Sequence, residues 1–121
     1  MRKVNRKTGI KLRLVLEPEV AFGPGKADLL QGIQETGSIS AAGRRQGMSY
    51  KRAWQLVDTM NRDFREPLVI ASKGGQRGGG AALTPTGRKV LDCYRKMVIK
   101  TEKAVSTELR QLRKAVAGTQ E

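Results

Sequence analysis

The sequence predicts a mainly α-helical fold with a small β wing, and three observations lead to this prediction. Apolar residues recur at intervals of three and four along several segments, which is the period of one helix face. Two short apolar stretches enclose a glycine-rich segment, as in a β-hairpin. The chain has 121 residues, the length of one domain. Together these observations predict a winged helix-turn-helix with a long C-terminal dimerisation helix.

The N-terminal part is expected to hold an arm and one strand. Residues 1–10 are basic and polar and are predicted to form a flexible arm. Residues 11–17 alternate between polar and apolar, which indicates a strand that Pro18 ends, and the segment 22–25 is typical of a turn. The buried face of the strand is expected to carry Leu12, Leu14 and Leu16.

Three helices follow, and the last two have the layout of a helix-turn-helix. The pattern predicts helices over 26–36 and 39–46, the second capped by Ser38. Gly47 stands where the turn requires a left-handed backbone, and Ser49 caps the third helix. Small residues are expected where the two helices cross: Ala42, Gly43 and Ala53.

The third helix carries the clearest apolar stripe. The stripe comprises Tyr50, Ala53, Trp54, Val57, Met60 and Phe64. Because Trp54 and Val57 lie on it, core packing is predicted for both side chains. Tyr50 begins the stripe but also stands at the groove-facing end of the helix, so both placements stay open.

A glycine-rich hairpin follows the third helix. Residues 68–72 and 81–83 are predicted to pair as strands, with Lys73 and Arg77 in the connection between them. The glycines do not match a phosphate-binding loop, because no Lys-Ser or Lys-Thr pair closes them and the segment joins strand to strand. Lys73 and Arg77 are expected to contact a DNA backbone or minor groove. The alternative is a loop without a binding role.

Residues 85–116 are expected to form one long helix that starts after Thr84. Its seam comprises Leu91, Tyr94, Val98, Thr101, Val105, Leu109, Leu112 and Val116. Such a helix would be about 45 Å long, so a monomer would expose much of the seam. We therefore expect residues 11–84 to bind DNA and 85–121 to dimerise. The predicted interface residues are Leu91, Tyr94, Val98, Val105, Leu109 and Leu112. The alternative is that this helix folds back over its own domain's core.

The charge of the chain points to a polyanionic partner. The chain has 24 lysines and arginines against 11 acidic residues, and three stretches contain basic but no acidic residues: 1–13, 36–57 and 67–91. Such segregation favours nucleic acid or an anionic membrane surface. No apolar run is long enough to span a bilayer and the N-terminus does not resemble a signal peptide, so a cytoplasmic protein without membrane contact is expected.

The same composition argues against enzymatic chemistry. The chain has no histidine and one cysteine, Cys93. A zinc cluster, an intramolecular disulfide framework and a Ser/His or Cys/His catalytic set are therefore excluded. We expect no catalytic residue, no metal site and no cofactor, and we interpret Cys93 as a structural thiol.

The first turns of the third helix supply residue types that read DNA. Arginine can bind guanine and glutamine can bind adenine bidentately, while lysine, serine and a helix N-terminus suit phosphate oxygens. The predicted DNA-binding residues are Ser49, Tyr50, Lys51, Arg52 and Gln55, together with Lys73 and Arg77 of the wing. Gln46 fits less well, because an apolar residue is usual at its place. The alternative is a helical hairpin with solvated charges.

Two motifs together resemble a known family. The runs GSISAAGRRQGMSYKRAWQLVDTMN (37–61) and GGQRGGGAALTPTG (74–87) closely resemble the N-terminal DNA-binding domain of ModE-type molybdate-responsive regulators. This resemblance implies a LysR-like winged helix-turn-helix in a bacterial or archaeal regulator that binds double-stranded DNA as a homodimer.

The resemblance also carries a departure. ModE-type proteins continue into β-barrel molybdate-binding domains, whereas this chain stops at Glu121. Molybdate is therefore not expected to bind this chain directly. Either the chain regulates without its own ligand, or a separate partner senses molybdate.

The expected function is sequence-specific regulation of transcription. The alternative is a non-specific architectural protein that binds DNA or RNA. RNA-binding modules usually expose stacking aromatics, and the five aromatic residues of this chain are mostly expected in the core, which disfavours RNA.

Overall fold

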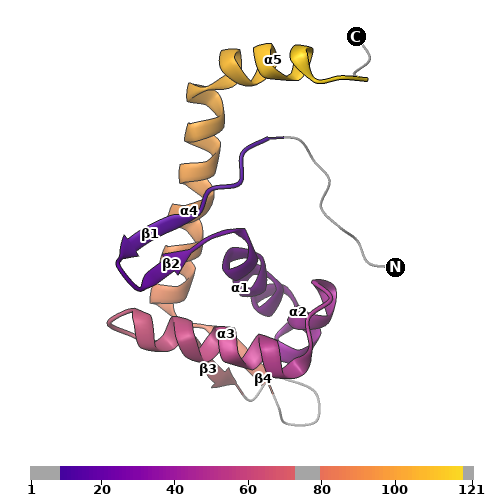
Figure 1. Cartoon of the computed structure of the whole chain (residues 1–121). Coiled ribbons are helices and arrows are strands. Elements are labelled where there is room, and N and C mark those ends of the chain that lie inside the picture. The colour runs from indigo at the N-terminus through magenta and orange to yellow at the C-terminus, as the bar shows by residue number, and fades with distance from the viewer. Residues whose placement is uncertain (1–8, 73–79, 119–121) are drawn as a thin grey trace.

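A computed structural model describes residues 9–72 and 80–118 of the chain. In Figure 1 the helices of the first half of the chain and the strands lie together at one end, and a long helix leads away from them. The elements are β1 (Leu14–Glu17), β2 (Val20–Phe22), α1 (Pro24–Thr36), α2 (Ile39–Arg45), α3 (Tyr50–Asp63), β3 (Val69–Ser72), β4 (Gly80–Leu83), α4 (Pro85–Ala104) and α5 (Ser106–Ala115). The prediction of a mainly α-helical fold with a β wing is confirmed.

One core joins these elements. Its largest fully buried side chains are Phe22, Leu29, Leu30, Ile33, Met60, Leu68 and Val57. They come from β2, α1, α3 and the residue before β3, so each short element contributes apolar surface that it could not bury alone. None of the described helices is long and apolar enough to cross a membrane.

The N-terminal segment forms a hairpin where a single strand was expected. β1 pairs antiparallel with β2, and Leu14 lies opposite Phe22. The prediction of a turn over 22–25 is therefore wrong, since Phe22 ends β2 and is 1% exposed and α1 begins at Pro24. A register shift between Val15 and Glu17 also turns Leu16 outward, at 48% exposure, against its expected burial.

Specific bonds fix the N-terminal segment along α4. The backbone N–H of Ile10 donates to a Glu102 carboxylate oxygen at 3.1 Å. The Tyr94 hydroxyl donates to the carbonyl of Leu12 at 2.7 Å, and burial raises the pKa of this hydroxyl. Ile10 is thus held in place rather than belonging to a flexible arm, while residues 1–8 of that arm lie outside the described residues.

The expected helix over 85–116 is broken at Val105, and this is a second correction. α4 ends at Ala104, and α5 begins at Ser106 and runs across the far end of α4 (Figure 1). Val105 has φ −112° and ψ 22°, outside the helical region. The break falls on Val105-Ser106-Thr107, three consecutive residues of modest helix propensity. α4 alone is therefore about 30 Å long.

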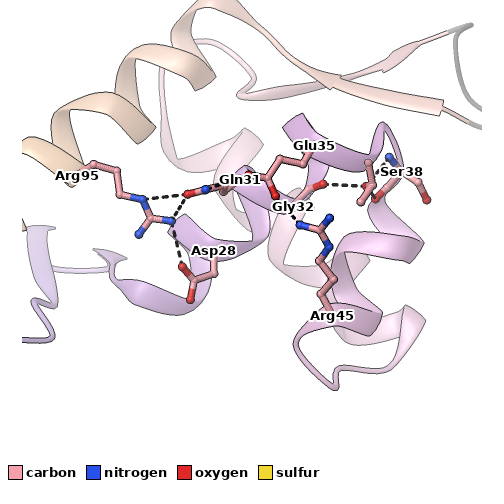
Figure 2. A network of polar contacts seen from close by, with 8 residues as sticks. Asp28, Gln31, Gly32, Glu35, Ser38, Arg45 and Arg95 are labelled. Carbon is pink, nitrogen blue, oxygen red and sulfur yellow. Dashed lines mark hydrogen bonds and ion pairs between the residues drawn. The ribbon is translucent and has the colours of Figure 1, made fainter. Parts of the chain in front are cut away.

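A chain of polar contacts connects α4 to α1 and α1 to α2 (Figure 2). The Arg95 guanidinium donates to the side chains of Asp28 at 3.1 Å and Gln31 at 3.2 Å. The Gln31 amide donates in turn to Glu35 at 3.0 Å, and Glu35 forms an ion pair with Arg45. These contacts hold the first two helices against the long helix.

Candidate nucleic-acid interface

The N-terminal end of α3 is capped and exposed to solvent. The Ser49 hydroxyl oxygen accepts a hydrogen bond from the backbone N–H of Arg52 at 3.0 Å, as predicted for a capping serine. Tyr50, Lys51 and Arg52 follow directly and are exposed, and Gln55 lies exposed about one turn further on. The five predicted residues of this helix thus occur together on one accessible end.

Close packing fixes α3 against α2. A Cβ atom added to Gly43 would lie 2.8 Å from the Cβ of Ala53, so only glycine permits this approach of the two helices. Gly47, between the helices, has φ +70°, the left-handed backbone expected there. Ala42 is also buried, as predicted. Gln46 stands where an apolar residue is usual, and its side-chain amide donates a hydrogen bond to the carbonyl of Gly25 at 3.5 Å.

Trp54 is not a core residue, and its predicted burial is wrong. Its side chain is 41% exposed, whereas Val57, assigned to the core with it, is 2% exposed. The fully buried residues of α3 are Ala53, Val57 and Met60, and Leu56 and Phe64 pack against the core beside them, so the core-facing side of the helix does not include Trp54. Tyr50 is 63% exposed, which settles its placement on the surface.

The strands of the wing are attached to the helix-turn-helix at two points. The Ala81 N–H donates to the carbonyl of Gly37 at 2.9 Å, which ties β4 to the turn before α2. The Asn61 amide on α3 donates to Val69 and accepts from the backbone N–H groups of Leu68 and Val69. The predicted pairing of the two strands is confirmed. Lys73 and Arg77 lie outside the described residues.

A cavity of about 290 Å³ lies between α3, the start of α2 and the strands of the wing. Its walls include Tyr50 and Trp54 from α3, Ser38 and Ser40 from α2 and its cap, and Ile70 from β3. The N-terminal end of α3 therefore borders a hollow that is partly apolar. No feature of the sequence had indicated this cavity, because its walls come from segments far apart in the chain.

Some basic residues of α2 and α3 form an ion pair with an acidic residue of the chain, and others do not. Arg45 is paired with Glu35, and this bond, followed by that from Gln31, holds the Glu35 pKa below its ordinary value. Within residues 9–72 and 80–118, Lys51 and Arg52 form no ion pair. Lys51 and Arg52 are therefore free to meet an anionic partner at the start of α3, as is the exposed Arg62 in its last turn.

Some residues of the predicted dimerisation surface are buried in the structure and others are exposed. Leu91 and Tyr94 are only 4% and 3% exposed, because they pack in the core of their own domain. For these two residues the interface prediction is corrected. Val98, Val105 and Leu109 are half-buried and Leu112 is 66% exposed, so their side chains keep surface for a partner.

The chain matches one family model and several curated proteins. The model of the bacterial regulatory helix-turn-helix protein, lysR family, matches residues 27–88. The molybdenum-pterin-binding protein MopB of Rhodobacter capsulatus is 49% identical over 73 residues, covering 60% of this chain and 27% of that protein. The molybdenum transport protein ModE of Azotobacter vinelandii is 36% identical over 108 residues, covering 88% of this chain and 40% of that protein.

A third relative and two solved structures agree with these matches. The DNA-binding transcriptional dual regulator ModE of Escherichia coli K12 is 38% identical over 85 residues, covering 70% of this chain and 32% of that protein. Full-length CbnR complexed with its target DNA has a TM-score of 0.56 at 18% identity, covering 74% of this chain and 29% of CbnR. ArgP of Mycobacterium tuberculosis has a TM-score of 0.52 at 18% identity, covering 70% of this chain and 30% of ArgP.

These matches identify the domain. The chain spans 27% to 40% of the length of the three curated relatives, and the two solved structures show the fold. The match over 27–88 includes α2, α3 and both strands of the wing. The chain belongs to the lysR family of bacterial regulatory helix-turn-helix proteins and carries a winged helix-turn-helix DNA-binding domain of the ModE type.

Proposed function

We propose that this chain regulates transcription by binding specific sequences of double-stranded DNA as a homodimer, with residues 11–84 as the DNA-binding domain. The observation that carries this proposal is the exposed, capped end of α3 with its unpaired Lys51 and Arg52. A helix of this kind fits the major groove of B-DNA, where its first residues meet base edges. The wing beside it would follow the adjacent backbone, with Lys73 and Arg77 as its proposed contacts.

Each α3 residue has a role that matches its chemistry. Arg52 can donate two hydrogen bonds to guanine, and Gln55 can exchange two with adenine, so these two carry base preference. Lys51 and the Ser49 end of the helix suit phosphate oxygens, which position the helix without selecting a sequence. The net charge of +13 supports association with DNA in general.

Replacing Arg52 by alanine is expected to weaken binding to the preferred duplex by about 10- to 100-fold and to relax base preference at one position. The physical reason is the loss of a bidentate contact of about 1–3 kcal/mol. The preferred duplex is first obtained by selecting bound fragments from the source genome. Dissociation constants are then measured for that duplex and for single-base variants, at several salt concentrations.

Arg62→Ala is the matched control, because Arg62 is an exposed arginine in the last turn of the same helix. If Arg62→Ala changes binding at all, it is expected to weaken binding to every duplex by the same factor. For the unmodified protein, log K should fall with log salt by about 0.9 for each phosphate contact. Equal affinity for every duplex tested would contradict sequence-specific binding and would favour a non-specific architectural protein.

We further propose that residues 85–121 form the dimer contact. Four large apolar side chains of this part are exposed: Met97 at 42%, Ile99 at 60%, Leu112 at 66% and Val116 at 57%. Exposed apolar side chains on α4 and at α5 provide surface that another chain can cover. We retain Val98, Val105, Leu109 and Leu112 from the predicted seam for this contact.

Leu112→Glu is expected to raise the dimer dissociation constant at least tenfold, because a carboxylate would be buried at the contact. The protein would then shift from dimer toward monomer. Sedimentation equilibrium measures this shift directly. Leu16→Glu is the control, since Leu16 is an exposed leucine on β1, away from α5. A dimer that tolerates Leu112→Glu as well as Leu16→Glu would place the contact elsewhere.

A link to molybdenum is proposed from the names of the relatives alone. MopB and ModE are named for binding or transport of molybdenum or its pterin. We assign no molybdate-binding role to the 121 residues themselves. Molybdate sensing, where it affects this domain, is proposed to reside outside these 121 residues.

A further inference from the structure

Exposed aromatic side chains gather at one place on the candidate interface. Of the five aromatic residues in the chain, three pack together, because the rings of Phe64 and Tyr94 both contact Phe22. The other two, Tyr50 and Trp54, lie one turn apart on α3 with 63% and 41% of their surface exposed. Their rings contact each other edge to face, with centroids 6.1 Å apart. Exposure of two adjacent rings indicates a contact outside the protomer.

The Tyr50–Trp54 pair borders the cavity between α3 and the wing. Ile70, which is 50% exposed, lines the same cavity together with polar residues such as Ser38 and Asp58, so the surface around the pair is partly apolar. Within the described part of the chain, the indole N–H of Trp54 has no hydrogen-bond partner. Within the described residues, the ring contact with Tyr50 is therefore the one specific contact recorded for the Trp54 side chain.

The chemistry of the pair selects its contact on DNA. Phosphate oxygens gain little from apolar rings, and the neighbouring Lys51 and Arg52 already suit them. Among the base edges in the major groove, thymine presents the one apolar group, its C5 methyl. We infer that the Tyr50–Trp54 pair covers a thymine methyl group in each half-site, an inference that rests on the proposed function. Trp54 is then a specificity-determining residue.

The test removes the methyl group and leaves every hydrogen bond in place. Each thymine of the preferred duplex is replaced in turn by deoxyuridine, and the dissociation constant is measured at fixed salt. The unmodified protein is expected to bind about fourfold more weakly when the covered methyl is lost. The Trp54→Ala variant is expected to bind duplexes with thymine and with deoxyuridine at that position equally, because the apolar partner of the methyl group is gone.

Two control variants separate this effect from general damage. Tyr50→Phe keeps both rings and is expected to keep the preference for thymine. Val15→Ala removes an exposed apolar side chain from β1 and is also expected to keep it. Thermal unfolding of Trp54→Ala should match the unmodified protein closely, because the side chain is 41% exposed.

Three outcomes overturn the inference. Indifference of the unmodified protein to every deoxyuridine would leave sequence recognition intact but show that the rings contact sugars or nothing. An undiminished methyl effect in Trp54→Ala would assign the contact to another residue. If no duplex is preferred at all, the proposed function fails and this inference fails with it.

Discussion

Phe22→Ala is expected to lower the free energy of unfolding by about 4 kcal/mol, a large part of the total stability of a domain this size. Phe22 is 1% exposed, and its ring meets Phe64 at 6.4 Å and Tyr94 at 5.3 Å between centroids, both edge to face. Alanine would leave a cavity at the junction of β2, α3 and α4. Both aromatic contacts, each worth about 0.5–1.5 kcal/mol, would also be lost.

Urea unfolding followed by circular dichroism measures this loss. Val15→Ala is the control, because Val15 lies on the paired strand but is 61% exposed. Its expected effect is within about 0.5 kcal/mol. If the two variants lost similar stability, the β1–β2 hairpin would not belong to the core.

Gly87→Ala is expected to destabilise the fold by about 3 kcal/mol through a steric clash with backbone. A Cβ atom at Gly87 would lie 2.2 Å from the carbonyl oxygen of Leu68. That oxygen cannot easily move, because it accepts the Thr84 N–H at 2.9 Å, at the start of α4. The substitution would push the start of α4 away from Leu68, the residue that precedes β3.

Gly25→Ala gives a direct comparison within another helix. No atom lies within 4 Å of a Cβ at Gly25 in α1. There alanine is expected to raise stability by about 0.5 kcal/mol, because it restricts the unfolded chain and favours the helix. Opposite signs in urea unfolding would confirm that packing at Gly87, and not helix propensity, sets its requirement for glycine. Equal signs would contradict this explanation.

Features set by local sequence were predictable, and those set by distant contacts were not. The serine caps at Ser38 and Ser49 and the left-handed Gly47 follow from short-range rules, and the structure confirms them. The exposure of Lys51 and Arg52 followed from their place directly after the Ser49 cap. These local signals were enough to locate the candidate interface.

Phe22 and Trp54 show where sequence reasoning failed. Phe22 stands beside Gly-Pro-Gly, so its neighbours suggested a turn, whereas pairing with β1 and packing against Tyr94 fix it in the core. Trp54 shares the apolar period of α3, but the described residues of α2 and the wing strands leave 41% of its side chain exposed. In both cases tertiary packing overrode the local pattern.

The bonds from Ala81 to Gly37 and from Asn61 to the residues around β3 have a thermodynamic consequence for binding. They join α3, the turn before α2 and the strands into one rigid unit before any partner arrives. The backbone of this unit loses its conformational freedom during folding, so association does not have to restrict it again. Ordering is then confined largely to long side chains such as Lys51 and Arg52, at about 0.5–1.5 kcal/mol each.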